Sequence, residues 1–227
     1  VAVKDGDEYV INGSKIFTTN SGFADTFLVF ALTDKEAGPH KGMSAFLVDR
    51  NTPGISVQPD IKRMGIRGAS NSEVVYTDVR VPAADLLGGE GKGFKIAMKA
   101  LDGGRIGIAA QALGIAEGAL DATIAYVKER KQFGRAIAAQ QNTQFQLADM
   151  ATKVEAAKMM VYKAAMAKAT QKVYSVEAAQ AKLYAAEVAM EVTTKAVQLH
   201  GGYGYIREYD VERMMRDAKI TEIYEGT

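Results

Sequence analysis

The chain has 227 residues, 48% of them hydrophobic, and its 28 Lys and Arg balance 27 Asp and Glu. This balance argues against a nucleic-acid-binding surface, which normally carries a clear basic excess. The absence of cysteine excludes a disulfide scaffold and thiolate metal sites, and the two histidines, His40 and His200, are too far apart in sequence to support a metal site.

Residues 1 to 90 have a pattern typical of β-strands. Asn12-Gly13 follows the apolar run 9–11 and predicts a hairpin, because Asn-Gly tolerates the positive φ of a type I′ turn. Further short apolar runs cover residues 26–32, 43–48 and 73–81. Several short strands at this spacing predict a small β-barrel or sandwich.

From Gly91 the pattern becomes helical. We expect long helices over residues 94–131, 142–169 and 175–200, and a shorter one over 210–218. Apolar stripes recur at helical spacing as Leu147, Met150, Val154, Ala157 and Val161, and as Ala179, Leu183, Ala186, Met190, Thr193 and Val197. Four helices with short connections predict an antiparallel bundle, so the expected fold class is α+β, with a β domain over residues 1–90 and a four-helix bundle over 91–227.

Two further features concern the helices. No apolar run approaches the ~20 residues of a membrane span, and we expect no membrane segment. The first long helix carries several glycines, each of which costs up to ~1 kcal/mol in a helix interior. They are Gly103, Gly104, Gly107, Gly114 and Gly118. Tight helix crossing and a ligand passing close to the backbone explain them equally well.

Three segments are candidates for chemistry, and each also has a purely structural interpretation. The run from Arg130 to Arg135 is either a basic helix end or an anion site, with Arg for phosphate and Phe133 for a ring. The glycine-rich run 198–205 is either a helix cap or a backbone that a ligand approaches closely. Glu225 follows Ile223 and Tyr224, which could desolvate its carboxyl group and raise its pKa, although an exposed carboxylate is the default.

The ordered set of these motifs resembles the acyl-CoA dehydrogenase family over the whole chain. The matching segments are Ile16-Phe17-Thr18-Thr19-Asn20, Met64-Gly65-Ile66-Arg67-Gly68, Gly91-Lys92-Gly93-Phe94, Leu101-Asp102-Gly103-Gly104-Arg105, Arg130-x-x-Phe133-Gly134, Gln198-x-x-Gly201-Gly202-x-Gly204, Met215-Arg216-Asp217-Ala218-Lys219 and Tyr224-Glu225-Gly226-Thr227. The resemblance implies a middle β domain followed by the C-terminal four-helix bundle. Because the chain starts at Val1 without Met and stops directly after a motif, we expect it to be a fragment that lacks the N-terminal helical domain and the start of the β domain.

The resemblance also implies a role for individual residues. Glu225 corresponds to the catalytic base, and Asp102, Arg105 and Gly226 correspond to substrate-side positions. The positions that match FAD contacts are Phe17, Thr18, Thr19, Arg130, Phe133, Gln141, Gln198, Leu199, His200, Gly201, Gly202 and Thr227. Some relatives place the base just before the arginine of the first bundle helix. Here that position is Gly104, which cannot serve, so the resemblance favours Glu225.

The implied reaction is α,β-dehydrogenation of an acyl-CoA thioester, with Glu225 taking the α-proton and the β-hydride passing to N5 of FAD. The segments 102–109 and 220–223 look most like the short-chain, butyryl-CoA branch. The resemblance implies electron-transferring flavoprotein as the electron acceptor, a homo-oligomer that is a dimer of dimers, and no metal.

Other interpretations remain open at this point. A medium- or branched-chain dehydrogenase, an oxidase or oxygenase on the same fold, and a non-catalytic assembly module are the alternatives. A scaffold has no need of a desolvated carboxylate, which favours the enzyme. We expect a bacterial cytoplasmic or mitochondrial matrix protein that is not secreted.

Overall fold

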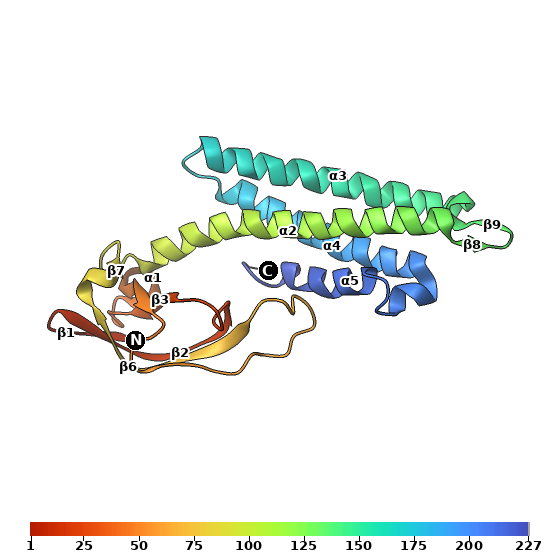
Figure 1. The fold of residues 1–227 in the computed structure, drawn as a ribbon. Coiled ribbons are helices and arrows are strands. Elements are labelled where there is room, and N and C mark those ends of the chain that lie inside the picture. Colours follow the sequence, from red (N-terminus) through yellow and green to blue (C-terminus); the bar gives the residue numbers. More distant parts are fainter. Residues whose placement is uncertain (227) are drawn as a thin grey trace. The chain divides into compact units, whose positions relative to one another are not determined.

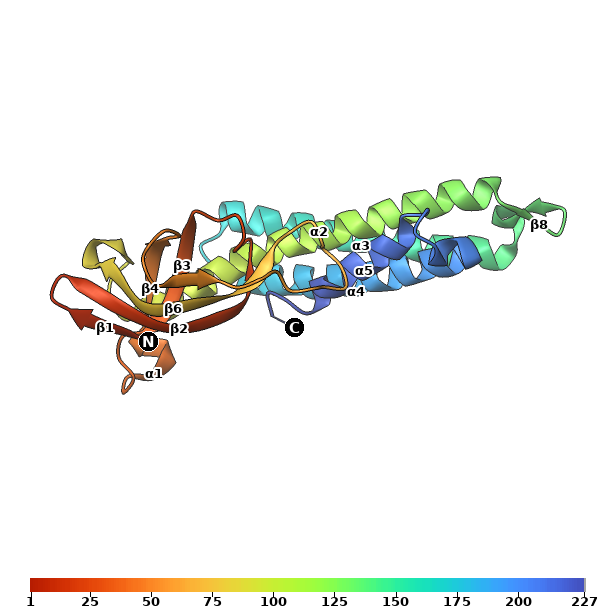
Figure 2. The same ribbon diagram turned by 60° about the horizontal axis from the view of Figure 1, so that its bottom comes forward.

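Two compact units divide the chain in the computed structural model, which describes residues 1–226. The first unit comprises Val1–Arg63 and Arg67–Ala100, and the second comprises Met64–Ile66 and the chain from Leu101 onward. Figures 1 and 2 show that strands dominate the first unit and helices the second. This order confirms the expected fold class, whereas the expected domain boundary at residue 90 stays a prediction.

The strands of the first unit pair antiparallel in two sheets. The four-stranded sheet has the order β1 (Ala2–Asp5), β2 (Glu8–Thr19), β6 (Asn71–Pro82) and β5 (Ile55–Val57). The three-stranded sheet has the order β3 (Thr26–Leu32), β4 (Met43–Asp49) and β7 (Leu86–Leu87). The short helices α1 (Gly38–Gly42) and η1 (Ala83–Asp85) lie in the connections.

One hydrophobic core joins the two sheets. Alternate residues of each strand face inward, as the period of two requires, and Phe46 and Val48 of β4 pack with Tyr9 of β2 and Val74 of β6. The rings of Tyr9 and Phe46 lie 5.1 Å apart between centroids. A single core between two antiparallel sheets is a sandwich, one of the two architectures that the strand spacing predicted.

The hairpin predicted at Asn12-Gly13 is wrong, because β2 continues through both residues. The Asn12 side chain accepts a hydrogen bond from the Asp78 N–H of β6 (2.8 Å) and donates one to the Asp78 carboxylate (3.0 Å). Asp78 has a φ of 49°, and the register of the two strands shifts here. The Asn-Gly pair therefore lies opposite a β-bulge in β6 at Thr77 and Asp78, while the turn between β1 and β2 lies at Gly6, whose φ is 60°.

The second unit is built from α2 (Gly93–Glu129), of which residues 101–129 belong to it, α3 (Gln141–Thr170), α4 (Ser175–His200) and α5 (Val211–Lys219). The connections contain β8 (Lys131–Gln132), β9 (Arg135–Ala136), η2 (Ile137–Ala139), η3 (Gly201–Tyr205) and η4 (Ile220–Glu222). Figure 1 shows the helices running alongside one another, joined at their ends by these short connections. The predicted four-helix bundle is confirmed, with boundaries within a few residues.

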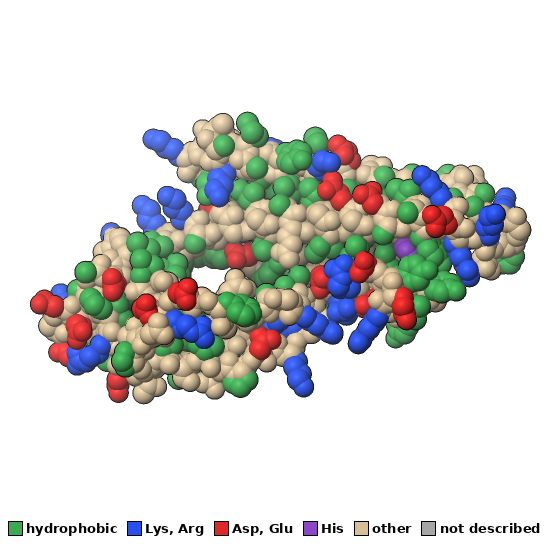
Figure 3. Space-filling view, viewed as in Figure 1, with side chains coloured by type: hydrophobic (Ala, Val, Ile, Leu, Met, Phe, Trp, Pro, Cys, Tyr) green, Lys and Arg blue, Asp and Glu red, His purple; other side chains and the backbone are tan. Residues whose placement is uncertain are grey.

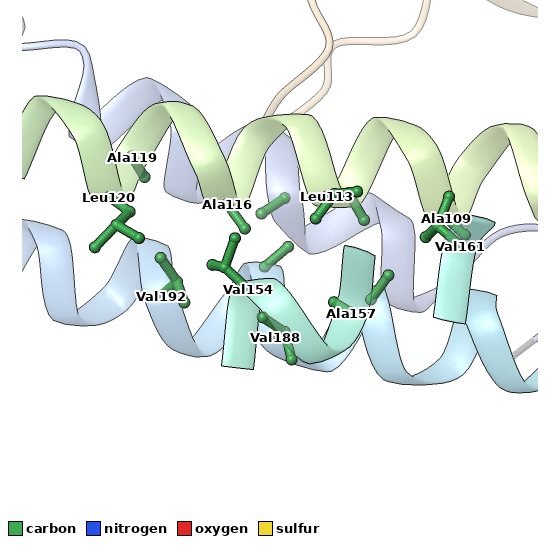
Figure 4. Packing of buried hydrophobic residues seen from close by; sticks show 14 of the residues in the cluster. Ala109, Leu113, Ala116, Ala119, Leu120, Val154, Ala157, Val161, Val188 and Val192 are labelled. Carbon is green, nitrogen blue, oxygen red and sulfur yellow. The ribbon is translucent and has the colours of Figure 1, made fainter. Parts of the chain in front are cut away.

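Alanine lets the helices approach closely. Figure 4 shows small and branched side chains of three helices meeting in one core, and they include Ala109, Leu113 and Ala116 of α2, Val154, Ala157 and Val161 of α3, and Val188 and Val192 of α4. The stripe predicted on α3 is confirmed, since Met150 and Val154 are buried and Leu147 is partly buried. The stripe predicted on α4 is partly wrong, because Ala179 and Leu183 are exposed and the buried face instead contains Ala178 and Lys182.

Helix α2 meets, by length and composition, the criteria for a membrane span, contrary to the expectation from the sequence. Its apolar side chains, among them Ala109, Ala112 and Ala116, lie in the core of the bundle. A core helix of a helical bundle accounts for its hydropathy. In Figure 3 acidic and basic side chains are interspersed over the visible face, in keeping with the near-zero net charge.

Two of the sequence motifs meet within the second unit. The Asp217 carboxylate of α5 accepts a hydrogen bond from the Ile66 N–H (2.6 Å), and Arg216 donates to the Met64 carbonyl (3.0 Å). Arg216 is itself held by an ion pair with Glu212 (2.7 Å). Residues 64–66 therefore belong to the helical unit although they lie within the β-rich part of the sequence.

Candidate functional site

Glu225 lies in the segment that follows α5 and η4. Its φ is 59°, an unusual value for a residue with a side chain, so the segment holds it in a constrained conformation. The preceding residue, Tyr224, anchors the segment by donating a hydrogen bond from its hydroxyl to Oε1 of Gln111 on α2 (2.6 Å). The Glu225 side chain lies against α2.

The Glu225 carboxyl group lies against Gly104 of α2. A Cβ atom at position 104 would be 2.5 Å from Oε2 and 3.0 Å from Cδ of Glu225, so only glycine leaves room for the carboxylate. Burial raises the pKa of the Glu225 carboxyl group above its ordinary value, and the nearby charges of Arg105 and Lys182 oppose this rise. Such a partly desolvated carboxylate suits a general base.

Arg105 links α2 to the Glu225 segment. Its Nε donates to the Glu225 carbonyl oxygen (3.0 Å), and its Nη1 pairs with the Asp102 carboxylate (3.1 Å). Asp102 also accepts a hydrogen bond from the hydroxyl of Ser175, the first residue of α4. The structure thus brings Asp102, Arg105 and Glu225, three of the residues singled out from the sequence, into one network. Gly226 adjoins them with a φ of 90°, which favours glycine.

Lys182 of α4 completes this network, and the sequence reasoning did not identify it. Its side chain is 4% exposed, and its ammonium donates to the carbonyl oxygens of Gly226 (2.5 Å) and Glu222 (3.3 Å). The sequence contained a hint of its burial, because Ala178, Lys182 and Ala186 follow one another at helical spacing. A lysine at such a position is, however, normally interpreted as the solvent-exposed edge of the apolar stripe.

A second candidate region is a cavity of about 540 Å³ at the opposite end of α4. Residues that line it include Arg130 at the end of α2, the run Gln198, Leu199, His200, Gly201 and Gly202, and the aromatic residues Tyr126 and Tyr203. The Arg130 guanidinium lies over the Tyr203 ring, 5.0 Å from its centroid. Two motifs that are far apart in sequence therefore form one cavity with a cation, aromatic rings and glycine backbone.

His200 forms part of the wall of this cavity. Its ring stacks on Tyr126 with centroids 4.1 Å apart, and its Nδ1 lies 2.8 Å from the Ala196 carbonyl oxygen. Burial lowers the pKa of the His200 imidazole. Gly201, which follows, has a φ of 60° and ends the helix, so the region serves as a helix cap as well as a cavity wall.

Two other residues expected near FAD do not line this cavity. Phe133 lies in the turn between β8 and β9, with a φ of 55° and 93% of its surface exposed. Gln141 is the first residue of α3 and is exposed. An aromatic ring that is exposed to solvent on a constrained turn is typical of a surface that contacts a partner or ligand.

Phe17, Thr18 and Thr19 lie at the end of β2 in the β unit. The register with β6 shifts between Lys15 and Thr18, and Phe17 has a φ of 58° with 67% of its surface exposed. Asn71 supports the segment by donating to the Phe17 carbonyl oxygen and the Thr19 hydroxyl, both at 3.4 Å. The bulge presents an aromatic ring and two hydroxyl groups at a sheet end. Thr227, the last residue expected near FAD, lies outside the described residues.

Two protein-family models match this chain, and between them they cover all the motifs described above. The model of the acyl-CoA dehydrogenase C-terminal domain matches residues 91–227, and that of the middle domain of the same family matches residues 1–79. A short-chain-specific acyl-CoA dehydrogenase of Clostridium acetobutylicum is 60% identical over 227 residues, which cover 100% of this chain and 60% of that protein.

Solved structures match equally well. Butyryl-CoA dehydrogenase from Megasphaera elsdenii has a TM-score of 0.97 and 55% identity, over 100% of this chain and 59% of that one. A chain in a structure described for the electron transferring flavoprotein of Acidaminococcus fermentans has a TM-score of 0.98 and 57% identity, with the same coverage. The chain thus spans about 60% of the length of these proteins. With both family models matching in order along its length, the chain belongs to the acyl-CoA dehydrogenase family.

Proposed function

We propose that this protein catalyses the FAD-dependent α,β-dehydrogenation of a short-chain acyl-CoA thioester to the trans-2-enoyl-CoA. The observation that carries the proposal is the Glu225 carboxylate, which is partly desolvated and lies on a constrained segment. It fits against α2 because Gly104 has no Cβ. A carboxylate with a raised pKa is the kind of group that removes a weakly acidic proton near neutral pH.

In this proposal Glu225 takes the α-proton of the thioester. The charge that develops on the thioester carbonyl oxygen needs a donor already in place, and the backbone N–H of Glu225 is suited to that role. Arg105 and Lys182 hold the carbonyl groups of residues 222, 225 and 226, so the segment is ordered before substrate arrives. FAD, when bound, supplies the acceptor for the β-hydrogen, which leaves as hydride.

The residues of the second cavity fit a dinucleotide cofactor. Arg130 offers a charge for a pyrophosphate, and Gly201 and Gly202 have open space where a Cβ would lie, so a phosphate could approach the backbone closely. Tyr126 and Tyr203 offer ring faces for stacking. We propose that this cavity holds part of the FAD of a neighbouring subunit. We further propose that Phe17, Thr18 and Thr19 contact the flavin ring of the FAD that their own subunit binds.

Anaerobic mixing of the flavin-loaded protein with butyryl-CoA tests the proposal. The expected result is bleaching of the flavin absorbance with formation of crotonyl-CoA, because the two-electron oxidation of the substrate reduces the flavin. A spectrum that butyryl-CoA and longer acyl-CoA thioesters leave unchanged would contradict the dehydrogenase and favour the assembly module.

A kcat/KM series from four to sixteen carbons tests the substrate class. We expect a maximum at four to six carbons, since the Clostridium and Megasphaera relatives are described as short-chain and butyryl-CoA enzymes. Each methylene in a fitted apolar pocket is worth ~1–3 kcal/mol, so the fall on either side should be steep. A maximum at eight carbons or more would assign the protein to a medium-chain branch.

We further propose electron-transferring flavoprotein as the electron acceptor and a dimer of dimers as the assembly. The Acidaminococcus structure, described in connection with an electron transferring flavoprotein, supports the first. The exposed Phe133 and Gln141, which do not line the cavity, support the second, because they would then contact FAD of a neighbouring subunit. The bacterial relatives support a cytoplasmic rather than a mitochondrial protein.

A further inference from the structure

Lys182 is an unusual residue for the interior of a helical bundle. Only 4% of its surface is exposed, and lysine is almost never this deeply buried unless it is paired. Within residues 1–226, no side-chain carboxylate forms an ion pair with it. Its ammonium instead donates hydrogen bonds to two backbone carbonyl oxygens, those of Glu222 and Gly226.

Burying an ammonium group costs free energy, which neutral carbonyl partners offset only in part. A methionine has similar length and would fill the same volume without that cost. The packing of α4 therefore does not explain a lysine at position 182. What distinguishes lysine from methionine here is the charge and the donors that it brings to the segment 222–226.

The two carbonyl groups that Lys182 holds lie on either side of Glu225. Arg105 holds the third, the carbonyl of Glu225 itself, at 3.0 Å. Asp102 orients Arg105, and Ser175 in turn donates to Asp102. Ser175 and Lys182 are seven residues apart on α4, two helical turns, and so lie on one face of the helix. One face of α4 thus supports the Glu225 segment in two ways. Lys182 contacts the segment directly, and Ser175 acts on it through Asp102 and Arg105.

We propose that Lys182 is a positioning residue of the Glu225 site, which fixes the backbone of residues 222–226 so that the carboxylate stays against Gly104. This inference rests on the function proposed above. It assigns no contact with substrate or cofactor to Lys182, which acts through the segment that it holds.

The charge of Lys182 has a second consequence at the same place. Among residues 1–226, the charged and titratable groups that act on Glu225 are Arg105 on α2, Lys182 on α4, and Tyr224 on its own segment. The two cations lower the Glu225 pKa against the effect of burial. Without the Lys182 ammonium, only Arg105 opposes the rise in the Glu225 pKa that burial causes. The Glu225 pKa then rises, and the carboxylate remains protonated to a higher pH.

The test compares Lys182→Met with Lys195→Met in the flavin-loaded protein. Lys195 lies on the same helix, and its ammonium pairs with Glu191 (2.8 Å), away from Glu225. For Lys182→Met we expect flavin reduction by butyryl-CoA to slow about 10- to 100-fold, since misplacing a reacting group by ~1 Å can cost 10²-fold. The acid limb of its pH profile should move to higher pH, with little change in the Kd for butyryl-CoA. Lys195→Met should match the parent in all three.

A crystal structure of each variant adds a readout that does not depend on turnover. In Lys182→Met the Glu225 φ should leave the positive region and the carboxylate should leave Gly104, while Lys195→Met should retain both. If Lys182→Met does not fold, Lys182→Gln replaces it, because the amide NH2 keeps two N–H donors and loses the charge. The acid limb of its pH profile should still move to higher pH.

The outcomes separate the two proposals. A parent protein that butyryl-CoA does not reduce contradicts the proposed function. If butyryl-CoA reduces the parent protein, and the Lys182 variant has the same rate, pH profile and Glu225 conformation as the parent, the proposed role of Lys182 is wrong and the proposed function stands.

Discussion

The two ends of α4 meet different kinds of site. Lys182 and His200 are 18 residues apart, about 27 Å along a helix that rises 1.5 Å per residue. Near Lys182 the polar groups are tightly connected, and the backbone carbonyl groups of residues 222, 225 and 226 accept hydrogen bonds from two buried or half-buried cations. Near His200 the helix ends in glycine backbone beside a cavity of about 540 Å³ with aromatic walls.

The difference suits the two chemical needs of the proposed reaction, a base and a cofactor site. A base must be held within a fraction of an ångström, which takes a dense network of charge-assisted hydrogen bonds. A cofactor site must leave space and offer backbone, which takes glycine and flat rings. Substitutions at the Lys182 end should therefore change the rate of the chemical step, and those at the His200 end should change cofactor retention.

Glu225→Gln should have the largest effect. The amide is nearly isosteric but cannot accept the α-proton, so flavin reduction by butyryl-CoA should fall on the order of 10²–10⁴-fold or more. FAD content should stay at the parent level, because the change lies at the other end of α4 from the cavity. Stopped-flow reduction and the flavin-to-protein ratio measure the two. Reduction at the parent rate would remove Glu225 from its proposed role.

Gly104→Ala should come next. The new Cβ would lie 2.5 Å from the Glu225 carboxylate and push it from its position, so flavin reduction should slow by roughly 10²-fold. Alanine is the better helix former by up to ~1 kcal/mol, so the melting temperature should not fall. Gly107→Ala is the matched control, since nothing lies within 4 Å of its Cβ position. Equal rates for both variants would show that the carboxylate does not need this space.

Arg130→Ala tests the other end of α4. Losing a charge-assisted contact with a pyrophosphate should cost ~1.5–3 kcal/mol, or about 10- to 150-fold in the Kd for FAD. Subunit association should weaken with it if the cavity receives FAD from a neighbouring subunit. Lys128→Ala is the control, because Lys128 is exposed on the last turn of α2 and does not line the cavity. An unchanged FAD content and solution mass would make Arg130 an ordinary helix-end cation.

The smallest effect concerns stability. Because burial raises the pKa of Glu225 in the folded state, protonation of Glu225 stabilises the fold below the pKa of the unfolded chain, and this contribution is lost as pH rises through the folded-state pKa. Glu225→Gln lacks that loss. Its melting temperature should therefore exceed that of the parent by a margin that grows from pH 4 to pH 7.

The same melting series on Glu187→Gln provides the comparison, since Glu187 is exposed on α4. A margin for Glu225→Gln that is constant or shrinks with rising pH would show that the Glu225 carboxylate is not desolvated.

Local patterns account for most of the fold that could be predicted. The runs over residues 26–32 and 175–200 coincide with β3 and α4, because periodicity and caps are properties of neighbouring residues. Asn12-Gly13 was misread for the same reason. The dipeptide is compatible with a turn or with a strand that pairs with a bulge, and the hydrogen bond from Asp78, 66 residues away, selects the strand.

The sequence by itself determined the family and singled out Glu225 as the candidate base, since both rest on ordered motifs. Only the tertiary structure decided which face of α4 is buried, and with it the difference between the exposed Leu183 and the buried Lys182. From hydrophobicity alone, Leu183 would be expected to be buried and Lys182 to be exposed. Lys182 is buried because its ammonium finds carbonyl groups of residues 222 and 226, and no pattern within α4 records that those groups lie within its reach.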